Sequence, residues 1–295
     1  MTVSHKIQFG IKTTQFFPYA DILRVWQEAD GIPAIDHAWL FDHPMPIGQA
    51  DPGGPCLDGW TTLAALAAQT QRLRLGLMVG SNANQTPPQL AKRAATLDII
   101  ARGRLEFGLG VGGVEREHTA YGTDYFAPAE RIKRLGESCE IIKRMWMERV
   151  VDFDGQYYHF KEIYCEPKPV QKQPPFVIGA IGEQLALRVV AQHADVWNLP
   201  GVPYTTLDDF QRKSQIVDGY CADIGRDPAS IVRSIQLIID PKANPAPTCQ
   251  LLQDYIGLGA THFVIGPRSI DAGIAHWLTE QIIEPVRAAV GDTVS

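Results

Sequence analysis

Short apolar runs alternate with amphipathic segments along the whole chain. Eight runs are apolar at nearly every position, which is typical of parallel strands buried on both faces: Ile7–Ile11, Ala38–Phe41, Leu75–Val79, Leu105–Leu109, Phe176–Ile178, Val196–Leu199, Ile231–Ile239 and His262–Ile265. Between them, apolar residues recur at the 3.6-residue spacing of helices, at Ile22–Ala29, Gly59–Gln69, Gln89–Ile100, Glu130–Met147, Gln184–Gln192, Leu207–Ile224, Cys249–Ile256 and Ile270–Val290. This alternation favours an α/β fold, a closed (β/α)8 TIM-type barrel formed as one domain by residues 1–295. A doubly wound open sheet is the alternative.

Two irregular segments interrupt the alternation. Between the fourth helix and the fifth strand, residues 150–175 predict a β-hairpin insertion, because Asp154-Gly155 is a strong hairpin-turn signal. Pro44–Cys56, rich in proline and glycine, directly follows the second strand. Either segment could cover a site at that end of the barrel, and the alternative is a surface excursion without a function.

Composition narrows the class of protein. Hydrophobic residues make up 45% of the chain, which is enough to bury a large core, and the formal net charge is −6. A net negative charge without a basic stripe argues against nucleic-acid binding. No apolar run approaches the roughly 18 residues of a membrane span, and the first ten residues lack a signal peptide. The five cysteines are scattered without CxxC spacing, so we expect a reduced cytoplasmic protein without a zinc site or disulfide framework.

Polar and glycine-rich clusters follow four of the predicted strands. In a parallel barrel the C-terminal ends of the strands meet on one face, where ligand chemistry gathers. The clusters therefore predict one shared site, formed by Asp42-His43, Gly80-Ser81-Asn82, Gly110-Val111-Gly112 and Gly179-Ala180-Ile181-Gly182.

Each cluster suits a different task. His43 can accept or donate a proton near neutral pH, although Asp42-His43 could instead only cap a loop. Gly80-Ser81-Asn82 allows a flat ring to approach the backbone, or forms an ordinary turn. Glu115 and Glu117 follow Gly112, where an acidic residue either reaches the site or stabilises a helix N-terminus.

The cluster Gly179–Gly182 lies between a strand and a helix, where free N–H groups suit a phosphate. A tight turn without a ligand is the alternative. Asn198, at the end of the next strand, could add a hydrogen bond. The spacing after Gly110 fails the GxGxxG dinucleotide pattern because residue 115 is glutamate. The chain also lacks a Walker lysine, an HExxH motif and a GxSxG nucleophile elbow, so phosphotransferase and hydrolase functions lose their usual support.

Several ordered segments resemble a known family. Arg72–Gly76, Leu90–Asp98 and Gly103–Gly110, followed by Asp152–Tyr158, Ile178–Glu183 and Ala194–Asn198, are similar to the bacterial-luciferase-like flavin and deazaflavin superfamily. Trp39–His43 resembles its coenzyme F420 (deazaflavin) branch. The resemblance implies that coenzyme F420 is the cofactor, with FMN as the alternative, and that the protein is a homodimer joined by helices near the second to fourth strands.

The resemblance also implies roles for single residues. His43 would lie near the hydride-transferring carbon. Glu115 matches the acidic residue of the sugar-phosphate branch, whereas Glu117 matches the more general superfamily glutamate, and these two alignments conflict. We expect His43 and Glu115 to be catalytic, and the cofactor to be bound by Asp42, Gly80, Ser81, Asn82, Gly110, Gly112, Glu117, Gly179, Ala180, Ile181, Gly182 and Asn198. The family often carries a cis non-proline peptide here, which predicts one at Gly80–Ser81 or Ser81–Asn82.

Two departures from the family pattern are visible. Gln184-Leu185 stands where many relatives carry a basic residue, and Pro44-Met45-Pro46 stands where some dehydrogenases carry a tryptophan. The first departure puts the contacts to the cofactor's phosphate or tail in doubt. The second indicates a substrate different from that of the characterised dehydrogenases.

Three functions remain open from the sequence. The leading one is hydride transfer between coenzyme F420 and a small organic substrate. The second is monooxygenation with reduced FMN and oxygen, and the third is cofactor binding without turnover. A Schiff-base aldolase needs a buried lysine at a strand end, and no lysine directly follows the second to sixth predicted strands.

Overall fold

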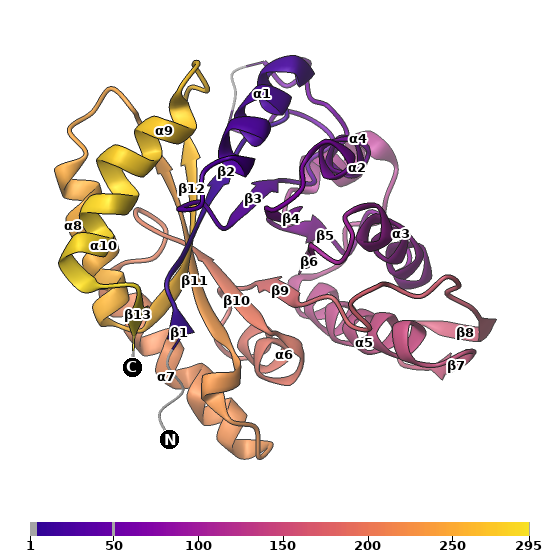
Figure 1. Cartoon of the computed structure of the whole chain (residues 1–295). Helices are drawn as coiled ribbons and strands as arrows, with labels where there is room; N and C mark the ends of the chain where they lie inside the picture. Colours follow the sequence, from indigo (N-terminus) through magenta and orange to yellow (C-terminus); the bar gives the residue numbers. More distant parts are fainter. Residues whose placement is uncertain (1–4, 49–50, 295) are drawn as a thin grey trace.

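A closed parallel barrel forms the centre of the computed structural model, which describes residues 5–48 and 51–294 (Figure 1). The barrel strands are β2 (Gln8–Lys12), β3 (His37–Leu40), β4 (Arg74–Leu77) with its short neighbour β5 (Gly80–Ser81), β6 (Leu105–Gly110), β9 (Phe176–Gly179), β10 (Val196–Pro200), β11 (Val232–Ile239) and β12 (Ala260–Pro267). The pairings of β12 with β2 and of β4 with β6 close the sheet. The predicted TIM-type barrel is therefore confirmed, and the predicted strand ends agree to within two residues.

Helices form the outer layer of the barrel (Figure 1). They are α1 (Tyr19–Asp30), α2 (Gly59–Gln69), α3 (Pro87–Ile100), α4 (Glu115–Tyr121), α5 (Pro128–Met147), α6 (Ala186–His193), α7 (Leu207–Asp223), the 3₁₀ turn η1 (Pro228–Ser230), α8 (Ala246–Gly257), α9 (Ile274–Leu278) and α10 (Glu284–Val290). Their apolar faces pack on the barrel strands and form a continuous core. No helix within residues 5–48 and 51–294 is long and apolar enough to cross a membrane.

The last predicted helix, Ile270–Val290, is wrong as a single element. It begins only at Ile274, after Gly273 in the left-handed region, and a π turn, η2 (Thr279–Ile283), separates α9 from α10. Pro285 follows in the first turn of α10. A proline lacks the N–H of a regular α-helix and its ring clashes with the carbonyl one turn earlier, which explains why the helix cannot run through this region with uniform geometry. The ends of the chain meet where β1 (His5–Lys6) pairs with β13 (Thr293–Val294).

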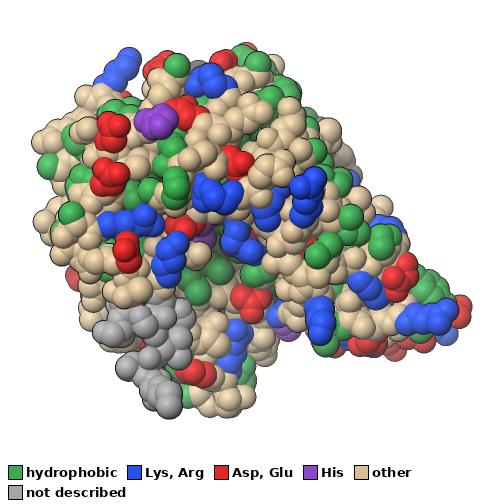
Figure 2. All heavy atoms as spheres, in the orientation of Figure 1, with side chains coloured by type: hydrophobic (Ala, Val, Ile, Leu, Met, Phe, Trp, Pro, Cys, Tyr) green, Lys and Arg blue, Asp and Glu red, His purple; other side chains and the backbone are tan. Residues whose placement is uncertain are grey.

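The insertion between α5 and β9 is the predicted hairpin. Strands β7 (Val151–Asp154) and β8 (His159–Ile163) pair antiparallel, and the Glu137 carboxylate accepts the backbone N–H groups of Gln156, Tyr157 and Tyr158. The hairpin projects beyond α5 at the right of Figures 1 and 2, where its surface carries charges of both signs. None of its residues lines the cavity described below, which favours the alternative of a surface excursion.

Polar side chains occupy the barrel interior below the cavity. The rings of His37 and His262 stack with their centroids 4.0 Å apart, and Trp39 Nε1 donates to His37 Nδ1 at 2.6 Å. Glycines make room for these rings, because a Cβ at Gly76 would lie 2.5 Å from the Trp39 ring and one at Gly10 would overlap His37. Two glycines in the strands thus allow large polar rings inside the barrel.

A line of hydrogen bonds runs from this interior to the C-terminal ends of the strands. Asn198 Nδ2 donates to Ser234 Oγ at 2.8 Å, so the Ser234 hydroxyl can donate to His262 Nδ1, also at 2.8 Å. This arrangement leaves the proton of a neutral His262 on Nε2, which lies 3.7 Å from Glu106 Oε2. Glu106 also forms an ion pair with Arg74. The side-chain amide of Asn198 is therefore oriented by groups buried deep in the barrel.

Candidate functional site

A cavity of about 630 Å³ opens at the C-terminal ends of the barrel strands. It gathers the clusters predicted from the sequence, since its lining includes Asp42, His43, Gly80, Ser81, Gly110, Gly112, Glu117, Gly179, Ala180, Ile181, Gly182 and Asn198. Asn82 and Glu115 are the predicted site residues that do not line it. Asn82 is buried and borders a neighbouring, smaller hollow. Of the segment Pro44–Cys56, Ile47 reaches the cavity, whereas residues 49–50 lie outside the described residues.

His43 and Glu117 form the most specific pair in the cavity. His43 Nδ1 lies 2.9 Å from Glu117 Oε1 and 3.0 Å from Oε2, and the Glu117 side chain is only 8% exposed. A carboxylate accepts from Nδ1–H, which leaves Nε2 of a neutral imidazole free to accept a proton. Tyr121 Oη donates to the Pro44 carbonyl at 2.9 Å, so α4 is tied to the loop that carries His43.

Glu115 does not reach His43. It is exposed in the first turn of α4, whereas Glu117 is buried two residues later. Two residues correspond to about 200° around a helix axis, so the two carboxylates point to nearly opposite sides of α4. The carboxylate beside His43 is therefore that of Glu117, and not that of Glu115 as expected from the sequence. Glu115 instead places a negative charge at the N-terminus of α4, where it stabilises the helix.

Asp42 accepts a hydrogen bond from the backbone beside the cavity. Its Oδ2 atom accepts the Ser81 N–H at 3.0 Å, which joins the end of β3 to β5. Burial raises the pKa of Asp42 to about 6, although the Ser81 N–H opposes the shift. The side chain thus lines the cavity and also holds one of its walls.

The predicted cis peptide at Gly80–Ser81 or Ser81–Asn82 is wrong in position. The cis non-proline peptide lies at Met78–Val79. Strand β4 ends at Leu77, and Gly80 and Ser81 already pair with β6 as strand β5. The irregular backbone is therefore confined to the step between β4 and β5, where Val79 points at the cavity wall.

The strand-end glycines accommodate this step. A Cβ at Gly110 would lie 2.7 Å from Val79 Cγ2, and one at Gly179 would lie 2.9 Å from the same atom. Gly112 has a φ of +72°, and its Cβ would lie 2.5 Å from Ser81 Oγ. The sequence predicted that these glycines let a ligand approach the backbone. In the structure, the space left by their missing side chains is occupied by Val79 and Ser81.

We expect Gly112→Ala to weaken cofactor binding by about tenfold. A left-handed φ costs a non-glycine residue about 1–2 kcal/mol, and the added methyl group would push Ser81 away from Asp42. The measurement is cofactor affinity by fluorescence quenching. Gly122→Ala is the matched control, because Gly122 has a similar φ of +69° and no neighbouring atom within 4 Å. Equal losses in both variants would contradict a specific role of Gly112.

The loop between β9 and α6 offers free backbone donors. Among the described residues, the N–H groups of Ile181 and Gly182 have no protein acceptor. Both residues line the cavity just ahead of α6. Unpaired N–H groups before a helix bind phosphate or carboxylate well, so this loop can hold the anionic part of a ligand.

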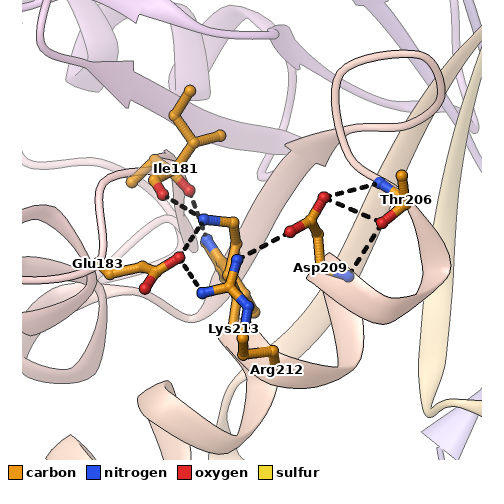
Figure 3. Close-up of polar contacts among 8 residues, drawn as sticks. Ile181, Glu183, Thr206, Asp209, Arg212 and Lys213 are labelled. Atoms are coloured by element: carbon orange, nitrogen blue, oxygen red, sulfur yellow. Dashed lines mark hydrogen bonds and ion pairs between the residues drawn. The ribbon is translucent and has the colours of Figure 1, made fainter.

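Basic residues reach this loop from a distant helix. Lys213 Nζ, on α7, donates to the Ile181 carbonyl at 2.9 Å and to Glu183 Oε1 at 2.9 Å (Figure 3). Arg212 bridges Glu183 and Asp209. Hydrogen bonds from Lys213 and Arg212 lower the pKa of Glu183. Lys213 therefore brings a basic residue to this loop, which only the packing of α7 reveals, but it pairs with Glu183 and does not line the cavity.

Three further polar side chains line the cavity that the sequence did not predict as site residues. Lys12 ends β2, Gln236 lies on β11, and Arg131 on α5 contacts the Gly112 carbonyl. Lys12 directly follows the first predicted strand, whereas no lysine directly follows the second to sixth. Its position is therefore a sequence signal of the same kind as the other strand-end clusters.

The residues present fit a flat cofactor that carries a phosphate. Apolar side chains of Met78, Val79 and Ile132 line the same cavity as the His43 imidazole and the loop with the free N–H groups of Ile181 and Gly182. A ring system needs such an apolar wall, and a phosphate needs such donors.

Comparison with known proteins places this architecture. The family model of luciferase-like monooxygenases matches residues 1–276. An uncharacterized protein of Mycobacterium tuberculosis is 30% identical over 223 residues, 75% of this chain and 73% of that protein. An F420-dependent glucose-6-phosphate dehydrogenase of Kineococcus radiotolerans is 33% identical over 175 residues, 58% of this chain and 50% of that protein.

Solved structures share the fold. An F420-dependent secondary alcohol dehydrogenase, in complex with an F420-acetone adduct, superposes with a TM-score of 0.84 at 16% identity and covers 96% of this chain and 100% of that one. A monooxygenase from Streptomyces bottropensis reaches a TM-score of 0.73 at 20% identity, over 94% of this chain and 99% of that one. The same barrel therefore occurs both in an F420-dependent dehydrogenase and in a monooxygenase.

Proposed function

Because the chain belongs to the luciferase-like monooxygenase family, we propose that it is an oxidoreductase that transfers a hydride between coenzyme F420 and a small organic substrate. The observation that carries this proposal is the His43–Glu117 pair in a cavity with an anion-binding loop at its other side. Hydride transfer to or from a substrate hydroxyl needs a proton to move at the same time. The pair supplies a group that can move it.

The chain's own residues have separable tasks in this proposal. When bound, the deazaflavin ring accepts or donates the hydride. The N–H groups of Ile181 and Gly182 would hold its phosphate, and the apolar side chains of the cavity wall would contact the ring. His43 Nε2 takes a proton from a substrate hydroxyl or returns it, while Glu117 holds Nδ1 and fixes the imidazole's orientation.

Monooxygenation with reduced FMN is the alternative. The family model is described by that activity, and the loop at Gly182 would serve the phosphate of either cofactor. The two cofactors call for different surroundings of the reacting atom. A monooxygenase must admit oxygen to the ring, whereas a hydride transfer needs a proton-moving group close to it, as His43 would be.

Parallel titrations with coenzyme F420 and FMN separate these functions. We expect the protein to bind coenzyme F420 at least about tenfold more tightly than FMN, because the proposed function requires a site that favours the deazaflavin. The measurement is fluorescence on the same protein preparation. Preference for FMN, together with oxygen consumption in the presence of reduced FMN, would replace the proposal by monooxygenation. Tight binding without turnover of any screened substrate would leave a cofactor-binding protein.

A further inference from the structure

Lys12 is a cation on the cavity wall without an anionic partner. It ends β2, lines the cavity, and its Nζ donates to Gln236 Oε1 at 3.0 Å and, at 3.5 Å, to the Met78 carbonyl. Both acceptors are neutral. Within residues 5–48 and 51–294, no carboxylate lies within 4.0 Å of this ammonium. The other ionisable groups that line the cavity are Asp42, His43, Glu117 and Arg131.

A buried ammonium of this kind is costly unless something compensates its charge. Burial lowers the pKa of Lys12 to about 8, so the side chain is still mostly protonated at pH 7. An ammonium has three donors, and two of them are used by Gln236 and Met78. The remaining donor, and the uncompensated charge, face a cavity built for a ligand. Buried charges in proteins are normally paired, so a ligand that fills the cavity can supply the counter-charge of Lys12.

We propose that Lys12, oriented by Gln236, binds a negatively charged oxygen of the molecule that occupies the cavity. Two sources share this chemistry: an oxygen of the cofactor's pyrimidine ring, and a carboxylate or enolate oxygen of the substrate. The inference rests on the proposed function only in that a redox cofactor shares the cavity. Lys12 would thereby decide which charge the site accepts, a role separate from proton transfer at His43.

Phe41 lies beside both groups. Its ring centroid lies 5.2 Å from that of His43 and 5.8 Å from Lys12 Nζ. The imidazole and the ammonium therefore border the same aromatic ring, and both line the cavity. One bound molecule could thus meet a proton-moving group and a positive charge in the same cavity.

The charge state of Lys12 provides a direct test. Incorporation of lysine labelled with ¹³C at Cε gives each unmodified lysine an NMR signal, and the Lys12 signal is the one missing in Lys12→Arg. We expect its titration midpoint near pH 8 in the free protein. An anionic oxygen at Nζ should raise the midpoint by about one pH unit, which by linkage corresponds to about tenfold tighter binding of the anion to the protonated form. The probes are FMN and coenzyme F420, each oxidised and reduced, and then acetate, pyruvate and benzoate with cofactor present.

Affinities of the same probes for Lys12→Met give the second readout. The probe that raises the midpoint should bind Lys12→Met at least tenfold more weakly than the unaltered protein. Lys161 is an exposed lysine on β8, so Lys161→Met should bind the probe as tightly as the unaltered protein does. A response to a cofactor alone identifies the ring oxygen as the partner. A response to a carboxylate identifies the substrate.

The inference is overturned if no probe moves the Lys12 midpoint, or if Lys12→Met binds every probe within threefold of the unaltered protein. The outcome stays distinct from that of the proposed function. Failure of both cofactors to bind the unaltered protein contradicts the proposed function, while a carboxylate that shifts the Lys12 signal in that same protein still supports an anion site. Because the NMR midpoint is measured with Lys12 present, poor folding of Lys12→Met would not remove the test.

Discussion

His43→Ala is expected to lower turnover by about 10²–10⁴-fold, the usual contribution of a general acid or base. Cofactor affinity should change by less than about threefold, because the loop proposed to bind its phosphate, at Ile181 and Gly182, follows β9, three strands around the barrel from β3. The measurement pairs steady-state kinetics on a substrate found by screening with a fluorescence titration of the cofactor. An unchanged rate would show that His43 does not move the proton.

Two further variants sharpen this result. Glu117→Gln keeps a hydrogen-bonding group beside Nδ1 but removes the charge, so its rate should fall between those of His43→Ala and the unaltered protein. Glu115→Gln carries the same substitution on an exposed position of α4 and should have an unchanged rate. If Glu115→Gln lost as much activity as Glu117→Gln, the assignment of the site carboxylate would be reversed.

Glu106→Gln is expected to lower the free energy of unfolding by about 3–5 kcal/mol, the cost of removing one partner from a buried charged group. Glu106 is 7% exposed and lies between Arg74 and His262. The neutral amide would leave the Arg74 guanidinium without its counter-charge. Urea unfolding at neutral pH measures the loss, and Glu115→Gln, on the surface, should stay within about 0.5 kcal/mol of the unaltered protein.

The same carboxylate predicts a pH dependence. Burial alone would raise the pKa of Glu106, but its contacts with His262 and Arg74 prevail and lower the pKa from 4.5 to about 2. A group with a depressed pKa in the folded state stabilises the fold above its unfolded value and loses this contribution as the pH falls. The stability supplied by Glu106 should therefore decline between about pH 4.5 and pH 2. Glu106→Gln should lack this part of the decline, and an identical decline in both proteins would contradict the assignment.

The barrel could be predicted from the sequence because buried parallel strands are apolar at most positions. Ile7–Ile11 and Phe176–Ile178 show this pattern with little ambiguity, and the structure places strands there. Leu75–Val79 is instructive in a different way. Its apolar run continues past the end of β4, because Met78 and Val79 pack against the barrel interior and line the cavity without belonging to that strand. Hydrophobicity alone does not separate such residues from those of the strand.

Site residues that directly follow a strand could be predicted from the sequence. Those whose position depends on the rotation or packing of a helix could be predicted less well. Asp42 and Gly179 follow strands directly, so the fold brings them together. The choice between Glu115 and Glu117 depends on the rotation of α4, a seven-residue helix too short to show a clear periodicity. Lys213 reaches its loop only through the packing of α7, some 30 positions along the chain from Glu183. Contacts of that kind depend on tertiary geometry, which local patterns do not encode.

The hydrogen bonds from Asn198 through Ser234 to His262 have an evolutionary consequence. In many barrels the C-terminal face can diversify while the opposite half maintains the scaffold. Here an amide at the rim depends on a histidine and a carboxylate in the interior. Mutations that adapt this rim to a new substrate would then have to preserve, or replace together, a set of buried partners. Descendants of this chain should vary more freely on the side of His43 than on the side of Asn198.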